Sequence, residues 1–150
     1  MLTETIRLET LRQKIEDAEY EAGNQSDYLD RGGPNAAQAK RAQQLIDKLN
    51  DQSKALKAEF KELIATVRLQ QPQAIEEWIN FHISILQKIV DEKTTGEKAS
   101  TRRFVAKTTI EEWEKVRAGE SEYVNINWYY LKDYKSRVRK IRRAWWQFWK

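Results

Sequence analysis

The stretch RGGPN, residues 31–35, separates two long segments that carry apolar residues at helical spacing. Gly32 and Gly33 suit the left-handed conformation that ends a helix, and Pro34 suits the first turn of the next helix. Two long helices joined by a turn of five residues fold back on each other as an antiparallel hairpin. The stretch therefore predicts a helical hairpin whose tip is formed by residues 31–35.

Apolar residues on both sides of this turn recur at alternating steps of three and four, which is the heptad spacing of coiled coils. Residues 1–30 carry 3 basic and 8 acidic side chains, and residues 31–70 carry 8 basic and 4 acidic ones, so opposite charge favours pairing of the two segments. We therefore predict a coiled-coil-like hairpin over residues 1–70. Its first seam is Leu8, Leu11, Ile15, Ala18, Ala22, Gln25 and Leu29. Its second seam is Ala39, Ala42, Ile46, Leu49, Ser53, Leu56, Phe60, Leu63 and Val67.

A third helix is predicted near Pro72, because the residues that follow are apolar on most of the helix circumference. Such a helix is buried on most of its surface, so we expect it at the centre of a small helical bundle formed by residues 72–150. Strand signals are nearly absent, and the predicted fold class is all-α: a long antiparallel hairpin followed by this bundle. One face of the third helix carries Ile75, Trp78, Ile79, His82, Leu86 and Ile89.

Between this helix and the last one, the sequence predicts a loop and a short helix. The polar stretch TTGEKAS, residues 94–100, is predicted to be the loop. Thr108 and Thr109 are each followed three residues later by a glutamate, a capping-box pattern that marks the start of a helix. Gly119 is the expected end of this short helix.

The last helix is expected to begin at a cap formed by Asn125 or Asn127 and to continue to the end of the chain. Residues 123–150 carry 8 basic side chains, 1 acidic side chain and 9 aromatic ones. One stripe of this helix is apolar and about 100° wide, as a helix facing a core requires. The stripe comprises Tyr130, Leu131, Tyr134, Val138, Ile141, Trp145, Phe148 and Trp149.

A second stripe lies beside the first and combines cations with tryptophans at steps of three and four. It consists of Trp128, Lys132, Lys135, Arg139, Arg142, Trp146 and Lys150, with Arg143 at its edge. An apolar contact alone does not require a cation at nearly every turn, and a purely solvated face does not require two tryptophans. We therefore predict that these eight residues form a binding surface.

Four interpretations of this basic stripe compete. A phosphate backbone can follow the cations while bases stack on the tryptophans. An acidic protein surface can meet the cations, with the tryptophans as hot spots. The helix can lie in a membrane interface. The acidic first helix, from this copy or another, can cover the stripe, with arginines stacked on the indoles.

The predicted function is that of a non-catalytic helical subunit of a nucleoprotein assembly, binding nucleic acid largely without sequence specificity. The alternative is a coiled-coil adaptor that binds protein partners or self-assembles. We favour these over a membrane interface because the apolar stripe is needed for the core. The expected partners are thus nucleic acid, other protein subunits, or a second copy of the chain.

Composition argues against several kinds of chemistry. The chain has no cysteine, which excludes disulfides and cysteine zinc sites and fits a reducing, cytoplasmic compartment. His82 is the only histidine, and its place on an apolar face predicts a buried, hydrogen-bonded side chain rather than a metal ligand or a base. No glycine-rich phosphate loop and no nucleophile with a nearby base is recognisable, so we predict no cofactor, no metal and no enzymatic activity. The longest uncharged stretch, residues 78–87, is too short to span a bilayer.

Overall fold

Five α-helices make up the regular structure of the computed structural model, which describes residues 1–148 of the chain and the side chains of residues 1–140. Within the described residues there is no strand, so the predicted all-α fold class is confirmed. The chain divides into two compact units, one of residues 7–66 and one of residues 1–6 together with the chain from Val67 onward. The helices are α1 (Thr3–Asp30), α2 (Ala36–Gln70), α3 (Pro72–Val90), α4 (Glu97–Arg117) and α5 (Lys132–Phe148).

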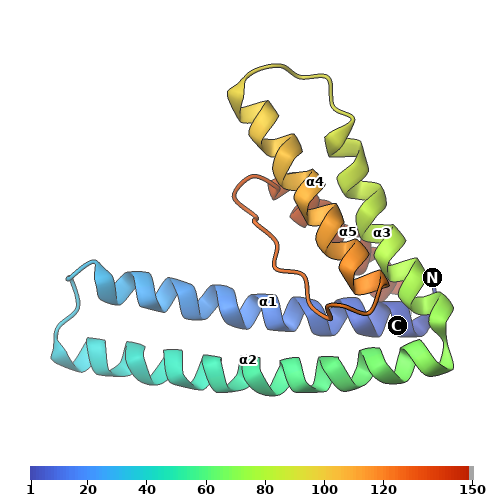
Figure 1. Ribbon diagram of the computed structural model, residues 1–150. Helices are drawn as coiled ribbons and strands as arrows, with labels where there is room; N and C mark the ends of the chain where they lie inside the picture. The colour runs from blue at the N-terminus through green and yellow to red at the C-terminus, as the bar shows by residue number, and fades with distance from the viewer. Residues whose placement is uncertain (149–150) are drawn as a thin grey trace. The chain divides into compact units, whose positions relative to one another are not determined.

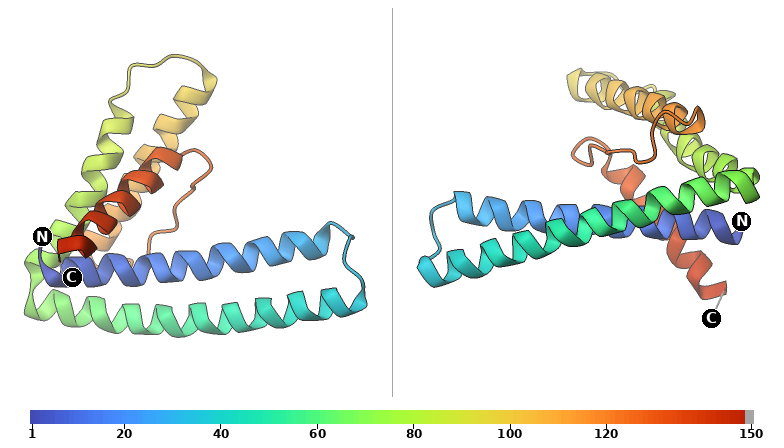
Figure 2. Two further views of the ribbon diagram at one scale, coloured as in Figure 1. Left: turned by 180° about the vertical axis from the view of Figure 1, so that it is seen from behind. Right: turned by 60° about the horizontal axis from the view of Figure 1, so that its bottom comes forward.

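The unit of residues 7–66 is built from α1 and α2, which lie side by side and run in opposite directions (Figures 1 and 2). Gly32, two residues beyond the end of α1, has a positive φ of 70°, the left-handed conformation expected of a residue that ends a helix. Asn35 and Gln38 then exchange hydrogen bonds. The Gln38 N–H donates to Asn35 Oδ1 (2.9 Å), and the Asn35 N–H donates to Gln38 Oε1 (3.0 Å). This reciprocal pair is a capping box, and it explains why α2 begins immediately after the turn.

The predicted seams are buried to different degrees on the two helices. On α1, the seam residues from Leu8 to Ala22 are between 0% and 8% exposed. On α2 the buried members are Ala42, Ser53, Phe60 and Val67, while Ala39, Ile46, Leu49, Leu56 and Leu63 are only half-buried. A coiled-coil packing of these seams stays a prediction, as does the independence of the segments 1–70 and 72–150.

A cluster of buried charges on α1 was not predicted from the sequence. Arg12 is 1% exposed, and its guanidinium binds Glu9 through Nε (3.0 and 3.1 Å) and Nη2 (2.8 Å). Its Nη1 donates to Glu16 Oε2 (2.8 Å), and Gln13 Nε2 donates to Glu9 Oε2 (2.8 Å). The spacings of three and four residues place these side chains next to one another on the helix. Arg12 therefore neutralises charge on both of these buried carboxylates.

The second unit contains α3 at its centre, packed against both α4 and α5. In Figures 1 and 2, α3 and α4 form an antiparallel pair joined by the loop that precedes α4. The apolar face predicted for α3 is buried at Ile75, Trp78, Ile79, His82, Leu86 and Ile89. Pro72 occupies the start of α3, where its missing N–H costs no helical hydrogen bond.

Residues 1–6 belong to this second unit because they are hydrogen-bonded to the first turns of α3. The Leu2 N–H donates to Glu77 Oε2 (2.9 Å). The Thr5 hydroxyl lies 2.8 Å from the same carboxylate oxygen and 3.2 Å from the Ala74 carbonyl oxygen. At the same end of the pair, Arg68 donates to the carbonyl oxygen of Val116 (2.9 Å) in the last turn of α4. This end of the α3–α4 pair is thus fixed by residues that precede α3.

The sequence-based prediction for α4 was wrong about its start and correct about its end. The helix begins at Glu97, so most of the predicted loop 94–100 is already helical. The Thr108 and Thr109 hydroxyls donate to the carbonyls of the preceding turn (2.9 and 2.7 Å), as threonines inside a helix do, and therefore cap nothing. Gly96, with φ at 115°, immediately precedes the helix, and Gly119, with φ at 79°, follows its end.

Candidate nucleic-acid interface

The segment before α5 is not helical, which corrects the predicted start of the last helix. Val124 and Ile126 are buried, whereas Asn125 and Asn127 between and after them are exposed. Asn127 does not cap a helix; its Oδ1 accepts a hydrogen bond from the N–H of Tyr129 two residues later (3.2 Å), an Asx-turn pattern. Helical structure starts only at Lys132, because the β-branched residues and asparagines of this segment favour extended and turn conformations.

The apolar stripe predicted on the last helix faces the core wherever the structure describes it. Leu131, Tyr134 and Val138 are each at most 1% exposed, while Tyr130 is half-buried. The predicted members at positions 141, 145 and 148 lie on α5, but their side chains are outside the described residues, as is the whole of Trp149.

A buried polar network ties α5 to α3 and α4. The Tyr134 hydroxyl oxygen lies 2.5 Å from His82 Nδ1 and accepts a hydrogen bond from Trp113 Nε1 (3.2 Å). The His82 ring is fully buried and stacks on Trp113, with ring centroids 4.1 Å apart and planes 12° from parallel. If Trp113 donates to the phenol and the phenol donates to Nδ1, all three groups are satisfied with a neutral histidine. The prediction of a buried, hydrogen-bonded His82 is confirmed.

Arg102 holds the first turn of α5 against the other helices of this unit. Its guanidinium binds Glu92 through Nε (3.1 Å) and Nη2 (3.0 Å), reaches the Tyr130 carbonyl oxygen (3.3 Å), and binds Asp133 (3.2 Å). The hydrogen bond with Glu92 is the main cause that raises the pKa of Arg102 above its usual value, with smaller contributions from the charges of Glu92 and Asp133. The single acidic side chain of α5 is therefore already paired with a cation.

The residues of the predicted basic stripe do not share one environment. Trp128 lies before α5 and is half-buried; its ring packs on Tyr134, with centroids 5.2 Å apart, and Lys135 Nζ lies 5.6 Å from the Trp128 ring centre. Lys135 and Arg139 are half-buried, and Lys132 is exposed. The side chains at positions 142, 143 and 146 (Arg142, Arg143 and Trp146) are not described, and Lys150 lies outside the described residues.

Three exposed residues near this stripe were missed by the sequence analysis. Tyr129 is 75% exposed, and Lys132 Nζ lies 5.9 Å from its ring centre. Arg137 and Lys140 are exposed on the side of α5 away from the buried residues. For Arg137 and Lys140 the helical wheel itself carried this signal, since the outermost face of a helix lies opposite its core stripe rather than beside it. We call Tyr129, Lys132, Arg137 and Lys140 the outer basic face.

Comparison of the chain with protein-family models, with curated proteins and with solved structures found no match. In the part of the chain that the structure describes, no three or more histidine, aspartate or glutamate side chains gather closely enough to hold a metal ion. Nor is any helix, over those same residues, long and apolar enough to cross a membrane.

Proposed function

We propose that this protein is a non-catalytic helical subunit of a cytoplasmic nucleoprotein assembly, and that it binds nucleic acid through α5 and the turn before it. The observation that carries the proposal is the exposed Tyr129 ring beside the Lys132 ammonium. Tyr129 precedes α5 and Lys132 begins it, and the outer side of this helix carries further cations. An exposed aromatic ring next to a cation is the combination that proteins use to bind unpaired bases and their phosphates together.

The phosphate contacts are assigned to Lys132, Arg137 and Lys140. All three are exposed, and the first and last are separated by about 12 Å along the helix axis. A nucleic-acid backbone presents several phosphates over such a length. Asp133 lies on the same side but is bound to Arg102, so its charge opposes phosphate binding less than an unpaired carboxylate does. Contacts of this kind are made to the backbone and carry little sequence information.

The base contact is assigned to Tyr129 in place of Trp128. A ring can receive a base only on an open face, and Tyr129 is 75% exposed, whereas Trp128 packs on Tyr134. Every base has a π-face, so stacking tolerates any sequence and contributes about 1–3 kcal/mol per base. This assignment favours single-stranded over double-stranded nucleic acid, because the bases of a duplex are already stacked.

The alternative, an adaptor that binds a protein partner, has one observation of its own. Phe104 on α4 is 70% exposed, and aromatic side chains are enriched in protein-binding surfaces. Under this alternative, truncating Phe104 abolishes capture of a protein partner, and the chain has no measurable affinity for oligonucleotides at moderate salt.

Fluorescence anisotropy with a labelled single-stranded oligonucleotide and with the matching duplex tests the proposal. Tyr129→Ala is expected to weaken single-strand binding by about 1–3 kcal/mol and to leave duplex binding nearly unchanged. Tyr28→Ala, which removes a 41% exposed tyrosine from α1, is the matched control and should change neither affinity. Equal losses in both tyrosine variants, or no binding by the parent chain, would reject the assignment.

A further inference from the structure

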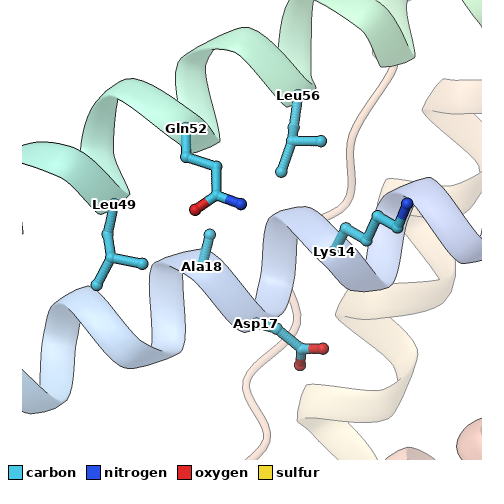
Figure 3. Close-up of a pocket in the computed structure, with 6 residues that line it drawn as sticks. All are labelled: Lys14, Asp17, Ala18, Leu49, Gln52 and Leu56. Carbon is cyan, nitrogen blue, oxygen red and sulfur yellow. The ribbon is translucent and has the colours of Figure 1, made fainter.

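An open groove lies between the two helices of the unit formed by residues 7–66. It has a volume of about 450 Å³ and is lined by Lys14, Asp17, Ala18, Leu49, Gln52 and Leu56. Figure 3 shows the side chains from α2 pointing toward α1, where Ala18 is the small residue opposite them. Because α1 presents the small side chain of Ala18 at this level, the leucines of α2 are only half covered.

The half-covered leucines continue along one flank of α2. Leu45, Leu49, Leu56 and Leu63 follow steps of four, seven and seven, so they lie in one row along the helix. Leu45 is 37% exposed and the other three are half-buried, while the neighbouring seam residues Ser53 and Phe60 are buried. We call these four residues the leucine row. A pair of helices has no second layer of structure over the flank of its contact. A row of half-buried leucines on this flank is therefore covered only when another element packs against it.

The charges beside the leucine row indicate what covers it. Gln52 lies near the middle of the row. Arg41 and Lys48 precede Gln52 in the sequence, and Glu59 and Glu62 follow it. All four charged side chains are exposed and fall on the same flank of α2. A second α2 running antiparallel, related by a two-fold axis beside Gln52, brings the basic end of each row to the acidic end of the other. A parallel arrangement would instead place like charges together.

We propose that a second copy of this chain covers the leucine row, with the two α2 helices antiparallel about a two-fold axis beside Gln52. Leu49 lies three residues before Gln52 and Leu56 four residues after it, so Leu49 of each copy packs on Leu56 of the other copy. Arg41 pairs with Glu62 of the second copy, and Lys48 pairs with Glu59. The interface is isologous, as closed two-fold dimers require.

The area available is large enough for a stable dimer. From Arg41 to Leu63, α2 is about 35 Å long, and α1 and α2 side by side are about 20 Å wide. Full coverage of this face removes about 1,400 Å² of surface from water over both copies, within the range of about 1,200–2,000 Å² for stable interfaces. This dimer is independent of the proposed nucleic-acid binding, because none of its residues lies on α5.

Sedimentation equilibrium of the full chain measures the mass directly, and the expected result at micromolar concentration is about twice the 17.8 kDa of one chain. Arg41→Glu with Lys48→Glu is expected to give a monomer, and Glu59→Lys with Glu62→Lys likewise. An equimolar mixture of the two variants should restore the dimer, because opposite charges meet again at both ends. Lys54→Glu with Lys61→Glu is the matched control, since these exposed lysines have the same spacing of seven on the other flank of α2.

A cysteine cross-link tests the two-fold axis itself. The chain has no cysteine, so Gln52→Cys introduces a single thiol that meets its own copy, and mild oxidation with diamide is expected to join two chains. Lys54→Cys should form no covalent dimer under the same conditions, because position 54 lies on the other flank of α2. A parent chain that sediments as a monomer at about 50 μM, or a dimer that survives both charge reversals and lacks the Gln52→Cys cross-link, would overturn the proposal.

Discussion

Replacing Tyr134 by phenylalanine removes one oxygen atom and leaves the packing of the ring in place. That oxygen accepts the hydrogen bond from Trp113 Nε1 and lies 2.5 Å from His82 Nδ1, and all three side chains are completely buried. Its loss takes a hydrogen bond from two buried polar groups, at about 1–3 kcal/mol each. We therefore expect Tyr134→Phe to lower the free energy of unfolding by roughly 2–6 kcal/mol.

Urea unfolding followed by circular dichroism measures this loss. Tyr129→Phe is the matched control, because Tyr129 is exposed and its variant should stay within about 0.5 kcal/mol of the parent. A double-mutant cycle with His82→Leu isolates the pair, and a coupling energy of about 0.5–3 kcal/mol is expected for groups in one network. A Tyr134→Phe variant as stable as Tyr129→Phe would show that the phenol oxygen does not satisfy these groups.

Three further predictions follow from the described contacts. Arg12→Ala leaves two buried carboxylates without their guanidinium and should cost about 3–5 kcal/mol in urea unfolding, whereas the exposed Arg31→Ala should cost less than about 0.5 kcal/mol; equal costs would mean that the Arg12 cluster is solvated. A chain that begins at Gln71 lacks the Thr5 hydrogen bonds to α3, so its urea midpoint should be lower than that of the full chain. Its unfolding should still be cooperative, and a broad, non-cooperative curve would place residues 1–6 in the core. Thr108→Ala should change the free energy of unfolding by less than about 0.5 kcal/mol, because Thr108 lies inside α4 and does not cap it. A loss of about 1 kcal/mol would instead indicate a helix cap.

Much of the helical architecture was predictable because it rests on apolar periodicity. The residues of α3 repeat at helical spacing on a wide face, and burial of that face is the largest favourable term for the helix. The turn at residues 31–35 was predictable for a different reason, because glycine tolerates the positive φ found at Gly32.

Helix starts were less predictable, because the same side chain can make different local hydrogen bonds. Thr108 matches a capping box in the sequence, yet its hydroxyl bonds a carbonyl of the turn before it. Asn127 was a plausible cap for the last helix, yet it makes a two-residue turn at Tyr129. In both cases burial of neighbouring residues decides where the chain becomes helical, and single-residue patterns do not carry that information.

The candidate site was predictable in kind but not in its particular residues. The excess of cations and aromatics after residue 123 directed the proposal to this region. The exposure of Tyr129 depends on where α5 begins, and the burial of the charged Arg12 cluster depends on packing around α1. Neither can be read from a helical wheel, because a wheel gives directions around one helix and not the neighbours that cover it.

The salt dependence of oligonucleotide binding tests the central proposal most directly. For single strands, each phosphate contact contributes about 0.7 to the slope of log affinity against log salt concentration. The variant Lys132→Ala with Arg137→Ala and Lys140→Ala should therefore reduce the slope by about 2. Removing the exposed Lys88, Lys93 and Lys98 in the same way should leave it unchanged. A parent chain without measurable binding at low salt, or equal slopes for the two triple variants, would contradict nucleic-acid binding by the outer basic face.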